Sequence, residues 1–212
     1  MYDLIMFDLD GTLVNSEEGV TKSVQYALNS FGIEENNQDN LRRFIGPPLV
    51  DAFKNFYNMT EENALMAVKK YRERYSKVGI YENELFDGVD ILLKGLKESG
   101  KKIALATSKP HIFAREILKS FNLTEYFDIL VGAEFDGTRN DKKDVISEVL
   151  KQAGEYKNPV MIGDRKHDVE GARENGVDFI GVSFGFAPEG EFEQFGVDKV
   201  VDSFKELIEI FL

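Results

Sequence analysis

The chain has 212 residues, of which 42% are hydrophobic and 30% charged, a balance typical of a folded globular protein. Its formal net charge of −12 argues against a general nucleic-acid or anionic-membrane binder, because those proteins need a basic surface. The absence of cysteine excludes disulfides and thiolate sites. No apolar run is long enough to span a bilayer and no signal-peptide pattern is present, so we expect a cytoplasmic protein, with a monomer as the default.

The first expected element is a buried strand over residues 4–7, followed at once by Asp8-Leu9-Asp10-Gly11-Thr12. Ligands of open α/β sheets bind where the strands end. In an extended chain Asp8 and Asp10 point to the same side, where two carboxylates repel unless a cation or a shared proton neutralises them. The spacing therefore indicates a hard metal ion and chemistry on a charged group. The alternative is a strand end followed by an ordinary acidic turn.

Residues 16–81 show no convincing strand pattern, only amphipathic helical patterns. Apolar residues that share one helix face include Val20, Val24, Ala27, Leu28 and Phe31 in the first half, and Ala64, Val68 and Tyr71 in the second. A crossover between parallel strands usually needs only about a dozen residues. We therefore interpret 16–81 as an inserted helical cap domain, and 1–15 with 82–212 as the core domain. The alternative is an elaborate crossover connection packed on the sheet.

The rest of the chain alternates between strands and helices. Further strands are expected over 102–107, 128–131, 159–162 and 179–182, with helices over 89–99, 112–120, 143–153, 169–175 and 204–211. This alternation predicts an α/β fold with a doubly wound parallel sheet and right-handed crossovers.

Polar residues follow four of these strands. They are Asp8 with Asp10, Thr107 with Ser108, Arg139 with Lys142, and Asp164 with Asp168. Each group has an ordinary alternative, since Thr, Ser and Asp often cap helices and lysines are usually solvated. Their convergence on one edge of a sheet is far more specific than any single member.

The chain resembles the haloacid dehalogenase superfamily, in the branch with a helical cap inserted after the first motif. The motifs that carry the resemblance are Asp8-Leu9-Asp10-Gly11-Thr12, the strand ending at Thr107, the lysine Lys142, and Gly163-Asp164-Arg165-Lys166-His167-Asp168. The segments 136–139 and 46–48 resemble the phosphoglycolate phosphatase-like and nucleotidase-like subgroup. The proline that usually follows the third-motif lysine is missing here.

The resemblance implies roles for these residues. Asp8 would be the nucleophile that forms an aspartyl phosphate, and Asp10 the general acid and base. Mg²⁺ would be held by Asp8, Asp164 and the Asp10 backbone carbonyl. Asp168 would complete the metal site and orient Lys142 or a metal-bound water. Thr107 and Lys142 would hold the phosphoryl oxygens. The residues expected at the substrate are Thr12, which would also position Asp10, Ser108, Gly46 and Arg139. Lys109 and Lys143 are alternatives to Lys142.

The function that follows is a Mg²⁺-dependent phosphatase acting on small phosphate monoesters, such as phosphoglycolate, nucleotides or sugar phosphates. The expected partner is a small phosphorylated metabolite, with no nucleic acid and no membrane. One alternative is a phosphomutase of the beta-phosphoglucomutase type. The other is a metabolite-binding protein without catalytic activity.

Overall fold

The structure is a computed structural model, which describes residues 2–135 and 138–212. The chain divides into two compact units. The first contains Met1–Asn15 and Leu85–Leu212, and the second contains Ser16–Glu84. Two short strands, β2 (Val14–Asn15) and β3 (Glu84–Leu85), pair with each other where the chain passes from one unit to the other.

The first unit is built on a parallel sheet of six strands in the order β5-β4-β1-β6-β7-β8. Their bounds are β1 (Leu4–Phe7), β4 (Lys102–Pro110), β5 (Ile129–Ala133), β6 (Pro159–Gly163), β7 (Asp178–Val182) and β8 (Val200–Val201). The predicted doubly wound α/β fold is confirmed. Only β8 is absent from the prediction, because two residues are too short for a period-two pattern.

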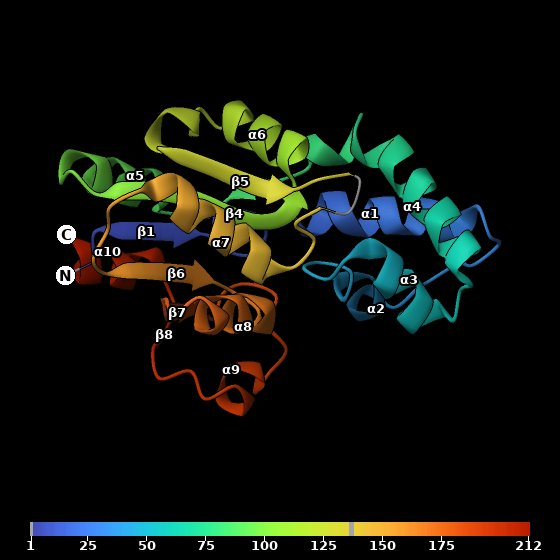
Figure 1. Ribbon diagram of the computed structural model, residues 1–212. Helices are drawn as coiled ribbons and strands as arrows, with labels where there is room; N and C mark the ends of the chain where they lie inside the picture. The colour runs from blue at the N-terminus through green and yellow to red at the C-terminus, as the bar shows by residue number, and fades with distance from the viewer. Residues whose placement is uncertain (1, 136–137) are drawn as a thin grey trace. The chain divides into compact units, whose positions relative to one another are not determined.

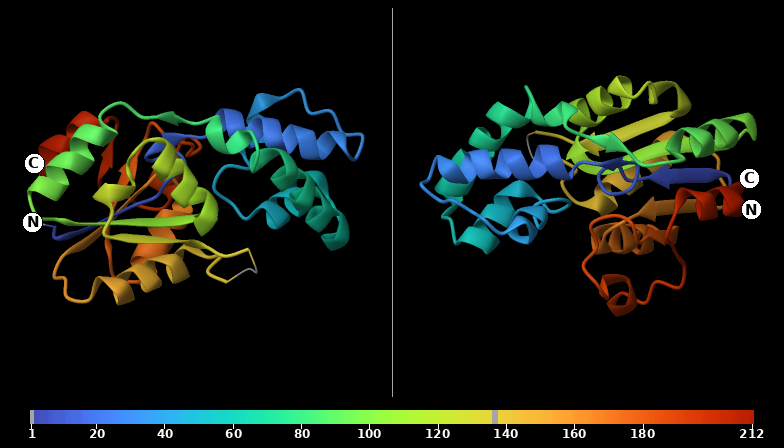
Figure 2. Two further views of the ribbon diagram at one scale, coloured as in Figure 1. Left: turned by 90° about the horizontal axis from the view of Figure 1, so that it is seen from above. Right: turned by 180° about the vertical axis from the view of Figure 1, so that it is seen from behind.

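Helices cover both faces of this sheet (Figures 1 and 2). One face carries α5 (Val89–Glu98), α6 (His111–Ser120) and α10 (Phe204–Phe211), and the other carries α7 (Lys142–Ala153) and α8 (Lys166–Glu174). The chain changes face after β5, where it crosses back past β4 and β1 to reach β6. A right-handed crossover in the reverse direction lies on the opposite face. Short helices η2 (Thr124–Tyr126) and α9 (Glu191–Gln194) lie in the connections.

The core under α7 and α8 determines where the first acid of the chain points. Leu4 and Met6 of β1 are fully buried in a cluster with Val145 and Val149 of α7. Side chains two residues apart in a strand share a face. Asp8, two residues after Met6, therefore emerges at the end of β1 on the side of α7 and α8.

The second unit is helical, with α1 (Glu17–Asn29), α2 (Gln38–Arg42), α3 (Leu49–Tyr57), α4 (Glu61–Tyr75) and the short helix η1 (Gly79–Tyr81). The apolar faces expected from the sequence form its interior: Val24 and Leu28 of α1 and Ala64 of α4 are fully buried. Arg74 donates to both carboxylate oxygens of Glu82, at 2.7 and 2.9 Å. The role of this unit as a cap stays a prediction. Among residues 2–135 and 138–212, no helix combines the length and apolar character needed to cross a membrane.

Candidate active site

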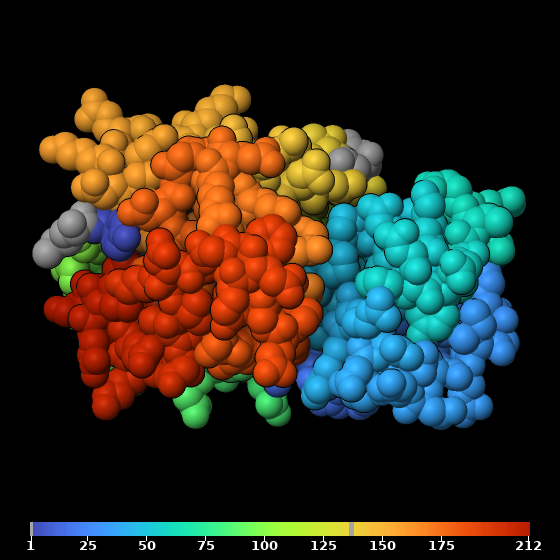
Figure 3. Space-filling model, turned by 90° about the horizontal axis from the view of Figure 1, so that it is seen from below, coloured from blue at the N-terminus to red at the C-terminus, as the bar shows by residue number. Residues whose placement is uncertain are grey.

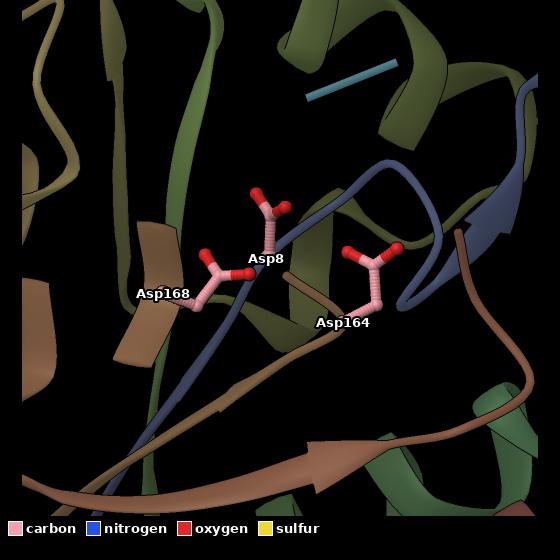
Figure 4. A group of neighbouring side chains, drawn as sticks. All are labelled: Asp8, Asp164 and Asp168. Atoms are coloured by element: carbon pink, nitrogen blue, oxygen red, sulfur yellow. The ribbon is translucent and has the colours of Figure 1, made fainter. Parts of the chain in front are cut away.

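Three carboxylates that are far apart in the sequence meet at the ends of the strands (Figure 4). Asp8 follows β1, Asp164 follows β6, and Asp168 lies in the first turn of α8. Each offers an oxygen within 4.8 Å of those of the other two, and all three residues are buried. The strand-end rule predicts this meeting, because parallel strands end at the same edge of a sheet.

One buried lysine accompanies the three acids. The Nζ atom of Lys142, the first residue of α7, lies 2.7 Å from Asp8 Oδ1 and 2.8 Å from Asp168 Oδ1. It also donates to the carbonyl oxygen of Ala106 in β4, at 3.0 Å. Burial lowers the pKa of Lys142, but the charges of Asp168 and Asp8 outweigh burial and raise the pKa above its usual value. Lys142 therefore carries a positive charge at neutral pH.

The negative charges of the acid cluster (Asp8, Asp164 and Asp168) are unfavourable where they are buried, as the raised pKa values of Asp8 and Asp164 show. Burial raises the pKa of Asp8 to about 6, against the opposing effect of Lys142. Burial also raises the pKa of Asp164 well above its usual value, and the charges of Asp168 and Asp8 raise it further. A single ammonium does not balance three carboxylates. A cation in their midst would do so.

The donor set fits a hard divalent cation. Mg²⁺ and similar ions take oxygen ligands from carboxylates, carbonyls and water. The buried Oδ1 of Asp164 has no hydrogen-bond partner among the residues that the structure describes, which leaves it available for a metal. The other carboxylate oxygen of Asp164 accepts from the backbone N–H of Phe186 at 2.7 Å. Such a bond fixes the orientation of a ligand.

Asp168 serves the helix and the cluster together. Its Oδ2 accepts from the backbone N–H of Arg165 at 3.1 Å, at the start of α8, while its Oδ1 contacts Lys142. Asp168 therefore caps the start of α8, as the alternative interpretation expected, and it also lies in the acid cluster. Lys142, one of the two partners expected for Asp168, is in contact with it.

Asp10 is not one of the three clustered acids, although its charge helps to raise the pKa of Asp8, and its side chain pairs with a different lysine. Lys109 Nζ donates to both carboxylate oxygens of Asp10, each at 2.8 Å, and both side chains are largely buried. The backbone N–H of Lys109 donates to the Thr107 hydroxyl at 3.2 Å. Strand β1 ends at Phe7. In the turn that follows, the backbone N–H of Gly11 donates to the carbonyl oxygen of Val14. The turn begins directly after Asp10, so the expected placement of Asp8 and Asp10 on one side stays a prediction.

The other predicted site residues are distributed as follows. Thr12 is fully buried, and its hydroxyl has no hydrogen-bond partner within the described part of the chain, so its action on Asp10 stays a prediction. Ser108 is half-buried in β4. Arg139 pairs with Glu134 and donates to the carbonyl oxygen of Gly132 at 3.3 Å.

The remaining expected features are Gly46, the segment 136–139 and Lys143. Gly46 is exposed in the turn between α2 and α3 of the second unit. Of the segment 136–139, Asp136 and Gly137 lie outside the described residues. Lys143, an alternative to Lys142, is half-exposed and lies 3.7 Å from Glu174. It has no contact with the three acids among those that the structure describes, so Lys142 is the lysine of the cluster.

The loop after β7 contributes to the site although the sequence analysis did not include it. A Cβ atom at Gly185 would lie 2.3 Å from Asp164 Cβ and 2.5 Å from Gly11 O, so only glycine fits there. The next residue, Phe186, donates to Asp164. The missed signal is a glycine just beyond the strand expected over 179–182, at the same edge as the other motifs.

Comparisons with known proteins agree with this geometry. Residues 5–182 match the family model described as haloacid dehalogenase-like hydrolase. The chain is 47% identical over 191 residues to a 5'-nucleotidase of Pseudomonas aeruginosa, covering 90% of this chain and 86% of the other. It is 26% identical to a phosphoglycolate phosphatase of Colwellia psychrerythraea, covering 97% and 95%. A crystal structure of a predicted phosphatase from Clostridium acetobutylicum superposes with a TM-score of 0.94 and 42% identity, covering 99% and 98%.

A further relative has a different name. The chain is 39% identical over 184 residues to the tyrosine-protein kinase PtkA of Mycobacterium tuberculosis. The matched region covers 86% of this chain and 62% of that protein. This chain therefore spans less than two thirds of the kinase.

The parallel sheet, the acid cluster and these matches define the class of protein as a phosphoric monoester hydrolase. The chain belongs to the haloacid dehalogenase-like hydrolase family. The resemblance read from the four motifs is thereby confirmed.

Proposed function

We propose that the protein is a Mg²⁺-dependent phosphatase that hydrolyses small phosphate monoesters through an aspartyl phosphate on Asp8. One observation carries the proposal: three buried carboxylates and a buried lysine meet where the strands end. Carboxylates without a balancing charge are costly to bury. The arrangement is explained if it binds a cation.

Asp8, Asp164 and the backbone carbonyl of Asp10 would hold the ion. When bound, Mg²⁺ neutralises negative charge on the phosphate and so lets an anionic nucleophile approach it. The N–H of Phe186 fixes one oxygen of Asp164 and leaves the other for the metal.

In the first half-reaction a carboxylate oxygen of Asp8 attacks phosphorus, and the bond to the leaving oxygen breaks. Lys142 holds the Asp8 carboxylate from one side and thereby limits its orientation. Asp10 in its acid form donates a proton to the leaving oxygen. The Thr107 hydroxyl, Ser108 and Lys142 stabilise the charge that shifts onto the phosphoryl oxygens.

In the second half-reaction Asp10 takes a proton from water, whose oxygen attacks phosphorus while the bond to Asp8 breaks. Inorganic phosphate leaves and the Asp8 carboxylate is restored. Lys109 Nζ lies 2.8 Å from both carboxylate oxygens of Asp10 and so fixes the orientation of the group that moves this proton. Lys109 thus acts on Asp10 as Lys142 acts on Asp8.

The 5'-nucleotidase relative makes nucleoside monophosphates the first candidate substrates, ahead of phosphoglycolate and sugar phosphates. The second unit acts as the cap in this proposal, with Gly46 in a loop that contacts substrate and Arg139 as a further contact. A cap that excludes bulk water and selects by size suits a small metabolite.

The deciding experiment measures phosphate release from a panel of phosphorylated metabolites, with and without Mg²⁺. Asp8→Asn is expected to abolish turnover while the fold is retained, because the amide cannot act as the nucleophile. The exposed residue Asp90 supplies the matched control, Asp90→Asn, with unchanged turnover. Substantial hydrolysis by Asp8→Asn would refute the nucleophile assignment.

Analysis of the products separates hydrolysis from transfer. Inorganic phosphate with the free alcohol supports the phosphatase. An isomeric sugar phosphate, or a phosphorylated acceptor, would instead support a phosphomutase or another transferase.

A further inference from the structure

A largely buried ion pair lies beside the acid cluster but outside it. Arg165 Nε donates to Glu191 Oε1 at 3.0 Å, and the same oxygen accepts from the backbone N–H of Lys166 at 2.9 Å. The two side chains retain only 14% and 9% of their exposure. Glu191 thereby binds the two residues Arg165 and Lys166, which lie between Asp164 and Asp168 in the sequence.

The position of Glu191 is fixed by its neighbour in α9. Phe192 packs on Gly181 of β7, where a Cβ atom would lie 3.0 Å from its ring, and it contacts the ring of Phe179. The loop that carries α9 leaves the sheet after β7 and returns at β8 (Figure 1), and this orange to red part of the chain forms much of one side of the surface in Figure 3. Glu191 is held against the start of α8 by the core of the first unit.

Arg165 is the cation closest in sequence to the proposed metal ligands. It directly follows Asp164, and its backbone N–H donates to Asp168. A guanidinium prefers to pair with carboxylates in a planar, two-point arrangement. Turned toward Asp164, it would occupy the oxygens that a metal needs. In the structure its Nε donates to Glu191, while its charge still acts on Asp164 and lowers the pKa of that carboxyl.

We infer that Glu191 is a positioning residue that draws Arg165 away from the acid cluster and so keeps Asp164 available to a divalent cation. The inference rests on the proposed metal site. It gives a function to α9, whose buried acid pairs with Arg165. Without Glu191, the Arg165 charge competes with the metal for the same carboxylates.

The test measures metal binding without turnover. Binding of Mn²⁺ is followed by loss of the free-ion electron paramagnetic resonance signal, with Mg²⁺ as competitor, and folding is checked by circular dichroism. Glu191→Gln is expected to weaken Mn²⁺ binding by about 10- to 100-fold, the range typical for groups that lie just outside the ligands of a metal site. Glu193→Gln is the matched control, because Glu193 is exposed on the same helix.

The double variant Glu191→Gln with Arg165→Met distinguishes charge from packing. If Arg165 is the competitor, its removal restores Mn²⁺ binding to near the wild-type level. Loss that persists in the double variant, or wild-type binding by Glu191→Gln, would overturn the inference. Should Glu191→Gln not fold, Arg165→Met alone carries the test, with binding at least as tight as wild type expected and weaker binding contradicting it. No Mn²⁺ binding by the wild type would instead overturn the proposed metal site itself.

Discussion

Lys142 offers the sharpest test of the electrostatics of the site. Its side chain is 4% exposed, and its Nζ lies 2.7 and 2.8 Å from the carboxylates of Asp8 and Asp168. Lys142→Met keeps most of the aliphatic side chain but removes the charge. Without metal, the three acids then have no ammonium among them.

The expected cost is large. Removing one partner of a buried ion pair typically costs about 3–5 kcal/mol, because the remaining charge stays buried. For a chain of this size, 1 kcal/mol corresponds to about 2–4 °C in Tm. The metal-free variant should therefore melt about 6–20 °C below the wild type at pH 7.5.

The assay is thermal unfolding followed by circular dichroism in the presence of a chelator. Lys143→Met is the control on the next residue, which is half-exposed, and its effect should stay within about 0.5 kcal/mol. At pH 5 the loss in Lys142→Met should shrink, because the pKa of Asp8 is raised by burial and the freed carboxylates take up protons. Equal melting of the two variants at both pH values would refute the reasoning.

Two further predictions concern the same cluster. Burial raises the pKa of Asp8 from 3.8 to about 6. Between these pH values the metal-free native state therefore binds more protons than the unfolded chain. The free energy of unfolding should fall by up to about 3 kcal/mol as pH rises through that window. Mg²⁺ should thus raise Tm more at pH 7.5 than at pH 5, and an equal rise at both would contradict the link between charge and metal. Gly185→Ala forces a Cβ atom against Asp164 and should cost about 1–3 kcal/mol while weakening the Mg²⁺-dependent rise in Tm. If Tm and its response to Mg²⁺ were both unchanged in Gly185→Ala, the close contact with Asp164 would not constrain the site, and the prediction would be wrong.

Most of the fold follows from local patterns in the sequence. The apolar runs before Asp8 and Asp164 mark strands, and the helical spacing through Val145 and Val149 marks a helix that covers them. Alternation of such segments leaves few topologies, because parallel crossovers have one hand. The two-residue strand β8 and the four-residue helix α9, which lacks a full apolar period, carry too little pattern to predict.

The meeting of Asp8 with Asp164 is also determined at this level, since any parallel sheet brings the ends of its strands to one edge. Which side chains touch there is decided only by the tertiary structure. The start of α7 turns Lys142, and not Lys143, toward the acids. Beyond the end of β1 at Phe7, the Asp10 side chain pairs with Lys109. Helix phase and loop geometry depend on packing between distant segments, and no local spacing encodes them.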